Sequence, residues 1–133
     1  MLPSASKTLY LVRHGQYRGA DAATGTLEVL TPLGRRQAVR LGRRLAPIPF
    51  DAIWHSDLPR AVETAQILAE QLPGVPRRAS KLLREGIPTA AAHFSPEFRP
   101  ARAQLLETRQ RMDQAFDRFV RASRKPRIEL IVA

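Results

Sequence analysis

The chain has 133 residues and no cysteine, and its 22 lysines and arginines against 12 acidic residues give a formal net charge of +10 at pH 7. The missing cysteine excludes disulfides, thiolate chemistry and cysteine-based zinc sites, and the 44% hydrophobic content argues against a disordered chain. The length suits a single domain over residues 1–133, and the charge favours anionic partners, unless most of the arginines simply cover solvated faces.

The regular structure begins with a short apolar run. Leu9–Val12 predicts a strand covered on both faces, and a polar loop from Gln16 to Val29 follows it. The stretch LTPLGRRQAVRLGRRLAP predicts a helix that Thr31 caps and Pro32 begins. Residues at helical spacing would face the core, namely Ala38, Leu41, Gly42 and Leu45. Arginines cover the opposite side, and a pair of prolines ends the helix.

The same alternation repeats further along the chain. A second strand is expected over Ala52–Trp54, and Pro59 begins a second helix that Pro73 and Gly74 end. The buried stripe of this helix would consist of Ala61, Ala65, Leu68 and Leu72. A third strand is expected near Ala79–Leu83.

The last third begins with a proline-rich stretch, Ile87 to Pro100, which predicts a loop. A long amphipathic helix should follow, with one apolar side formed by Leu105, Met112, Phe116 and Phe119. The final RIELIVA predicts a fourth strand. Strands that alternate with helices indicate an α/β fold with a mainly parallel sheet.

Polar residues follow three of the predicted strands. In parallel sheets, sites form just beyond the carboxyl ends of the strands, so these residues are expected to converge. The three stretches are Arg13-His14-Gly15, His55-Ser56-Asp57 and Arg84-Glu85-Gly86.

Together with Arg60, these residues supply the groups that phosphoryl transfer requires. The guanidiniums of Arg13 and Arg60 can fork onto phosphate oxygens, and the imidazole of His14 can act as a nucleophile. Gly15 lets the backbone approach a ligand closely, and Glu85 can give up a proton. Each residue also has a structural interpretation. In particular, a cation at a helix start such as Arg60 opposes the helix dipole unless an anion lies beside it.

Four motifs carry a resemblance to a known family. In order, LYLVRHGQ, LTPLGRRQA, SDLPRAVETA and LLREG resemble the histidine phosphatase superfamily, with its phosphoglycerate-mutase-like fold. The later LREG…HFSPE portion is similar to the phosphoglycerate-mutase-like protein phosphatase branch. The resemblance implies an α/β three-layer sandwich with a mainly parallel sheet flanked by helices, incomplete at the C-terminus.

The resemblance also implies roles for individual residues. His14 would become phosphohistidine, while Arg13 and Arg60 would grip the phosphoryl oxygens. Glu85 would protonate the leaving oxygen and then activate water, and Gly15 and Gln16 would line the substrate site. The resemblance implies no metal and no organic cofactor.

The sequence departs from the family at its last strand, after which a second pocket histidine is expected. RIELIVA fits that strand, and the chain ends at Ala133 without the histidine. We therefore expect a truncated chain, with a natural pseudoenzyme as the alternative. His55 is a possible substitute, although it can equally pack at a strand end. His93, in the proline-rich loop, is a possible residue at the pocket mouth.

Two functions from different classes follow. The first is a phosphatase that hydrolyses phosphomonoesters, either small phosphometabolites or phosphoprotein side chains, with a phosphorylated substrate or inorganic phosphate as ligand. The second is a catalytically impaired basic binding module, a pseudo-phosphatase or a non-specific nucleic-acid binder. Aromatic residues make up only 6%, which argues against dedicated nucleic-acid binding. With neither a signal-peptide pattern nor a membrane-length apolar stretch, we expect a cytoplasmic protein without membrane contact. Nothing in the sequence fixes an oligomeric state.

Overall fold

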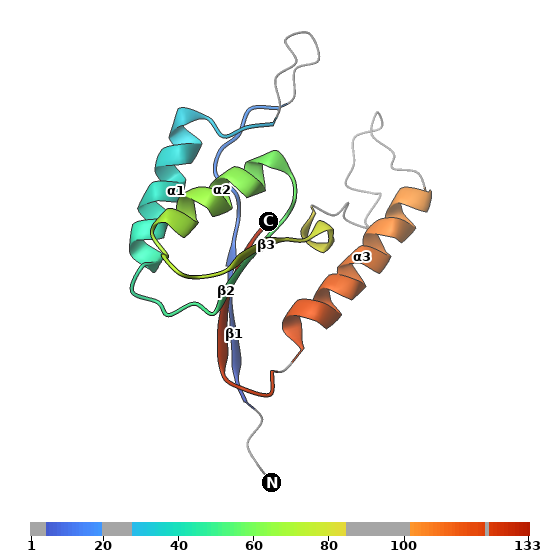
Figure 1. Ribbon diagram of the computed structural model, residues 1–133. Helices are drawn as coiled ribbons and strands as arrows, with labels where there is room; N and C mark the ends of the chain where they lie inside the picture. Colours follow the sequence, from blue (N-terminus) through green and yellow to red (C-terminus); the bar gives the residue numbers. More distant parts are fainter. Residues whose placement is uncertain (1–4, 20–27, 85–101, 122) are drawn as a thin grey trace. The chain divides into compact units, whose positions relative to one another are not determined.

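The computed structural model describes residues 5–19, 28–84, 102–121 and 123–133. The chain forms two compact units, Met1–Arg84 with Ala122–Ala133, and Glu85–Arg121. The first unit contains β1 (Lys7–Val12), α1 (Pro32–Leu45), β2 (Ala52–His55), α2 (Pro59–Glu70), β3 (Arg77–Ala79), the short 3₁₀ helix η1 (Lys81–Leu83) and β4 (Arg127–Val132) (Figure 1). The second unit contains α3 (Arg102–Val120).

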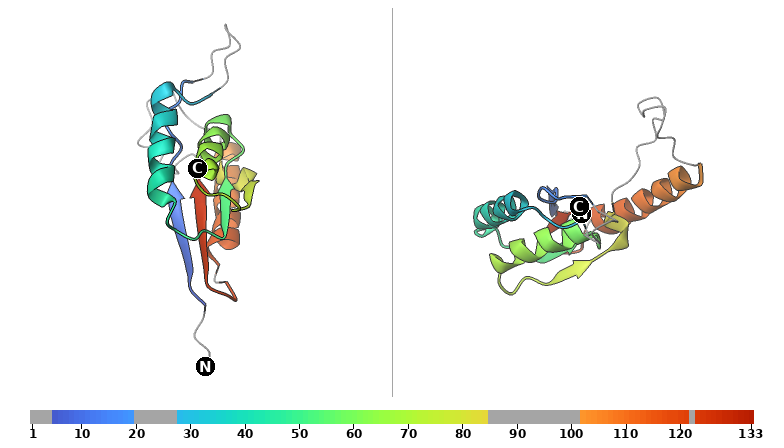
Figure 2. Two further views of the ribbon diagram at one scale, coloured as in Figure 1. Left: turned by 60° about the vertical axis from the view of Figure 1, so that its left-hand side comes forward. Right: turned by 90° about the horizontal axis from the view of Figure 1, so that it is seen from above.

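The first unit is built on a four-stranded sheet with the order β1-β4-β2-β3. All neighbouring strands pair in parallel, with Val12 opposite Val132 and Val132 opposite His55. The carboxyl ends of β1, β4 and β2 therefore reach the same edge of the sheet, and the strand arrows in Figure 2 point the same way. This confirms the expected α/β fold with a parallel sheet.

The core of this unit lies between the sheet and two helices. It contains Ile53 of β2, Leu130 and Val132 of β4, and side chains of α1 and α2. The helical members are Leu45, Ala65 and Leu68, with Phe50 and Leu72 from the connections. Figures 1 and 2 show α1 and α2 side by side, which agrees with the core face predicted for each helix.

Local sequence explains where the two helices begin. Pro32 is the first residue of α1, and the Oγ1 of Thr31 accepts a hydrogen bond from the N–H of Gly34 at 3.1 Å. Pro59 begins α2, and the Oγ of Ser56 accepts from the N–H of Leu58 just before it at 3.2 Å. The predicted caps of α1 are confirmed.

The third strand lies earlier than predicted. Its residues are Arg77–Ala79, and the apolar part of the expected Ala79–Leu83 segment instead forms η1. Every residue of β3 is exposed, so this edge strand has no apolar pattern that sequence could reveal. As a result, Arg84 follows a 3₁₀ turn and not the end of a strand.

In α3, the buried residues are Thr108, Ala115 and Phe119. The predicted apolar side is wrong for Met112 and Phe116, which are 51% and 65% exposed. Phe119 is buried as predicted, but the other buried residues are the small Thr108 and Ala115, which a pattern of large apolar residues does not indicate. Within the described residues, none of the helices combines the length and the apolar character needed to span a membrane.

Candidate active site at the strand ends

The loop after β1 lies against the end of β4. The backbone N–H of His14 donates to the carbonyl of Ala133 at 2.9 Å, and the N–H of Ala133 donates to the carbonyl of Val12 at 3.0 Å. The N–H of Ser56 donates to the carbonyl of Val132 at 3.0 Å. His14 and Ser56, predicted to converge, therefore flank the same strand end.

A hydrogen bond indicates which nitrogen of the neutral His14 imidazole carries the proton. Its Nδ1 lies 2.8 Å from the carbonyl oxygen of Gly15. Because a carbonyl oxygen only accepts hydrogen bonds, Nδ1 carries the proton and donates it to this bond. In the neutral imidazole, the lone pair then lies on Nε2, which is the form that a nucleophilic imidazole requires.

Two glycines let this loop approach the start of α1. A Cβ on Gly15 would lie 2.6 Å from the carbonyl oxygen of Gly34, and a Cβ on Gly34 would lie 2.0 Å from that of Gln16. Both positions therefore require glycine for close backbone packing. The loop that carries His14 is seated on the first turn of a helix.

Hydrogen bonds of Gln16 stabilise the same junction between the loop and α1. Its backbone N–H donates to Oε1 of Gln37 at 2.9 Å, and its Oε1 accepts from the hydroxyl of Thr31 at 2.7 Å. Its side chain thus holds the residue that caps α1. The substrate contact expected of Gln16 stays a prediction.

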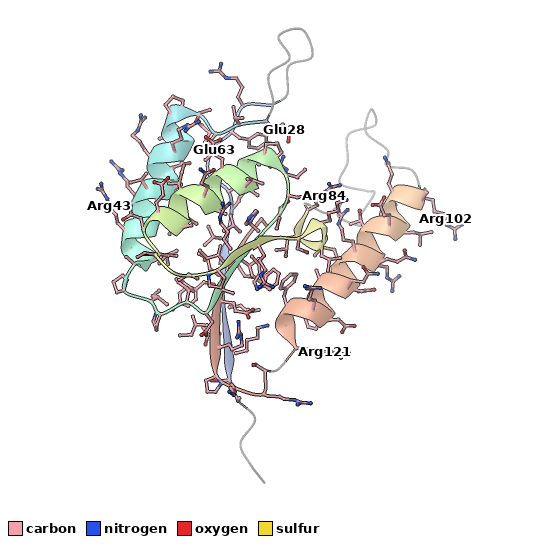
Figure 3. The ribbon with its side chains drawn as sticks, viewed as in Figure 1. Glu28, Arg43, Glu63, Arg84, Arg102 and Arg121 are labelled. Carbon is pink, nitrogen blue, oxygen red and sulfur yellow. The ribbon has the colours of Figure 1, made fainter. Side chains whose placement is uncertain are left out.

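Arg60 is the buried cation of the site. It lies in the first turn of α2 with a side chain only 6% exposed, and its Nη1 donates to Oε2 of Glu28 at 2.5 Å. Figure 3 shows Glu28 beside the end of α2 where this helix begins. A cation near a helix N-terminus is unfavourable unless an anion lies beside it, and the carboxylate of Glu28 is such an anion.

Tyr17 connects Arg60 with His14. The guanidinium carbon of Arg60 lies 4.6 Å from the centre of the Tyr17 ring, and that ring lies 5.0 Å from the imidazole centre, nearly perpendicular to it. Arg60 and His14 are distant in sequence, but both side chains contact the ring of Tyr17. Tyr17 and Glu28 were not identified from the sequence; the only indication was that both belong to the loop between β1 and α1.

Of the remaining predicted site residues, two are described by the structure and two are not. Arg13 follows β1 directly and is exposed beside His14, and Gly15 is buried. Glu85 and His93 lie outside the described residues.

His55 is buried at the end of β2, and its Nδ1 lies 2.8 Å from the carbonyl of Ser56. Burial lowers its pKa from the ordinary value of 6.5, and the cation of Arg77 adds to this, against the opposing effects of that hydrogen bond and Asp57. These features favour the interpretation that His55 packs at the strand end over the alternative that it replaces the second pocket histidine. Next to it, Asp57 receives two hydrogen bonds of 2.7 Å from Arg84, which lower the pKa of its carboxyl.

The arrangement combines a half-buried imidazole, whose Nδ1 is hydrogen-bonded to Gly15, with the buried guanidinium of Arg60, and the ring of Tyr17 contacts both. Such a pair can hold a tetrahedral anion while the imidazole attacks it. In the part of the chain that the structure describes, no group of three or more histidine or carboxylate side chains could hold a metal ion.

Comparison with known proteins identifies the family. The sequence profile of the histidine phosphatase superfamily (branch 1) matches residues 9–133. The mouse protein "Serine/threonine-protein phosphatase PGAM5, mitochondrial" is 39% identical over 118 residues, and the human protein of that name is 37% identical. Each match covers 87% of this chain, but the chain spans only 41% and 40% of those proteins. The expected cytoplasmic location is wrong, because these relatives are named as mitochondrial.

Solved structures agree on the fold. A phosphoglycerate mutase from Bacillus anthracis aligns with a TM-score of 0.70 at 24% identity, over 98% of this chain and 75% of that one. This likeness concerns the fold alone, whereas the profile match covers nearly the whole sequence. The chain belongs to the histidine phosphatase superfamily.

Proposed function

We propose that this chain is the catalytic part of a phosphatase that hydrolyses phosphomonoesters through a phosphohistidine on His14. The observation that carries the proposal is the pairing of an imidazole whose Nδ1 proton is held by Gly15 with the buried guanidinium of Arg60. We further propose that residues 1–133 belong to one domain.

In the first step, Nε2 of His14 attacks phosphorus, and the bond from phosphorus to the ester oxygen breaks. Arg13 and Arg60 hold the phosphoryl oxygens, where a guanidinium gains most as charge spreads in the transition state. Glu85 gives its proton to the leaving oxygen. Water then attacks the phosphohistidine, Glu85 takes a proton back, and inorganic phosphate leaves.

The substrate proposal draws on relatives. Their printed names describe serine/threonine-protein phosphatases, which favours phosphoserine and phosphothreonine side chains over small phosphometabolites. The same names favour a mitochondrial location.

Hydrolysis of p-nitrophenyl phosphate and of a phosphothreonine peptide tests the proposal. The purified protein should release phosphate from both, orthovanadate should inhibit it, and His14→Ala should abolish release. Equal activity of the His14→Ala variant would overturn the proposal. A folded protein that binds phosphate without hydrolysis would instead favour the binding module.

A further inference from the structure

We infer that Tyr17 is a positioning residue that holds the Arg60 guanidinium beside His14, an inference that rests on the proposed function. The ring centre of Tyr17 lies 4.6 Å from the guanidinium carbon and 5.0 Å from the imidazole centre. The guanidinium therefore lies no farther from the imidazole than the sum of these two distances.

The backbone of Tyr17 is fixed on the element that carries Arg60. Tyr17 forms an antiparallel bridge with Leu30, and the N–H of Arg18 donates to the carbonyl of Val29 at 3.1 Å. Leu30 is buried, and its N–H donates to Oε2 of Glu63 at 2.8 Å. Glu63 stands on α2, three residues after Arg60, and Figure 3 labels it on that helix. The stem that presents Tyr17 is thus attached to α2.

Burial of Arg60 strengthens its contact with the Tyr17 ring. The Arg60 side chain is only 6% exposed, so water does little to stabilise its charge or fix its direction. The carboxylate of Glu28, 35% exposed, attracts one edge of the guanidinium at 2.5 Å. The Tyr17 ring adds a cation–π interaction, which strengthens when the cation is desolvated. Without the ring, the guanidinium loses this contact and its direction is held less firmly.

The consequence should be greatest in the transition state. A misdirected guanidinium still attracts a phosphate dianion, but it matches the developing charge of the transferring phosphoryl group less well. Removal of the ring should therefore weaken binding of orthovanadate, a transition-state mimic, more than binding of inorganic phosphate. A purely structural role would lower stability and leave the ratio of the two affinities unchanged.

Three variants separate these cases. Tyr17→Leu removes the ring, and Tyr17→Phe keeps its face. Tyr10→Leu makes the same change at the other tyrosine, whose ring meets Phe50 edge to face in the core at 5.2 Å. For each purified protein, we would measure the dissociation constants of orthovanadate and phosphate, the rate of phosphohistidine formation and the melting temperature.

Tyr17→Leu should weaken orthovanadate binding and slow phosphohistidine formation about tenfold, the scale of a desolvated cation–π contact. Tyr17→Phe should stay near wild type, and Tyr10→Leu should lower the melting temperature without changing the affinity ratio. Wild-type affinity and rate in a folded Tyr17→Leu would overturn the inference, as would an equal change in Tyr10→Leu. If the wild-type protein forms no phosphohistidine, the proposed function is wrong, and the role of Tyr17 is wrong with it.

Discussion

The backbone N–H of Gly15 donates to Oγ1 of Thr64 at 3.1 Å, and the same hydroxyl donates to the carbonyl of Arg60 at 2.7 Å. One hydroxyl therefore joins the loop that carries His14 to the helix turn that carries Arg60. Thr64 is 1% exposed, so no water replaces it if it is lost.

Thr64→Val keeps the shape of this side chain and removes the acceptor. It leaves the buried N–H of Gly15 without its partner, so the free energy of unfolding should fall by about 1–3 kcal/mol. Thr64→Ser keeps the hydroxyl and should preserve the bond, losing only packing. Urea unfolding of the three proteins measures the difference, and a Thr64→Val variant as stable as wild type would contradict this account.

Gly34→Ala tests the close seating of the loop on α1. The added methyl group would lie 2.0 Å from the carbonyl oxygen of Gln16, so the loop or the helix must shift. We expect a loss of about 1–3 kcal/mol in the free energy of unfolding, despite the better helix propensity of alanine.

Gly19→Ala is the matched control for this change. A Cβ there meets none of the described residues within 4 Å, so the stability should change by less than about 0.5 kcal/mol. Equal destabilisation by the two substitutions in thermal unfolding would show that close packing is not the reason.

Arg60→Lys keeps the charge and removes the planar fork. A lysine cannot make two parallel bonds to a phosphoryl group, so the turnover number should fall about 100-fold, as for the loss of one preorganised donor. Arg36→Lys makes the same change at an exposed arginine of α1 and should leave turnover unchanged. Steady-state hydrolysis of a phosphomonoester compares them, and matching rates for all three proteins would argue against the role of Arg60.

His55 should make stability depend on pH. Burial lowers the pKa of His55 below 6.5. Between pH 6.5 and the lower pKa of the folded state, His55 is therefore protonated in the unfolded chain but neutral in the folded chain. The contribution to stability is complete above pH 6.5 and is lost as the pH falls through this window, with a slope of at most about 1.4 kcal/mol per pH unit.

His55→Asn removes this titration and keeps an N–H donor for the Ser56 carbonyl. The difference in free energy of unfolding between wild type and variant should therefore shrink as the pH falls from about 7.5 to about 5. Chemical unfolding at several pH values gives the two curves. Parallel curves would mean that burial does not suppress the charge of His55.

Sequence predicted most of the first unit because its signals are local. The helix that begins at Pro32 and the apolar run of β4 each carry their pattern within a few residues. The motifs predicted that His14 and Arg60 share a site; both side chains lie beside the Tyr17 ring, and their roles in catalysis stay a prediction. By contrast, β3 is short and fully exposed, and two of the three buried residues of α3 are the small Thr108 and Ala115, so neither element carries a pattern of large apolar residues that marks it.

The contacts of Tyr17 and Glu28 escaped prediction for a different reason. They depend on pairing between Tyr17 and Leu30 and on the attachment of Leu30 to Glu63. Such tertiary contacts follow no period along the sequence, so no local pattern indicates them.

The position of the phosphoryl group on His14 tests the central claim most directly. Because Nδ1 donates its proton to the Gly15 carbonyl, only Nε2 can attack. After reaction with a phosphomonoester and an alkaline quench, phosphorus NMR and peptide mass spectrometry should find Nε2-phosphohistidine at residue 14. Phosphate on Nδ1 of His14, on another residue, or on no residue of a protein that hydrolyses the ester would contradict the account.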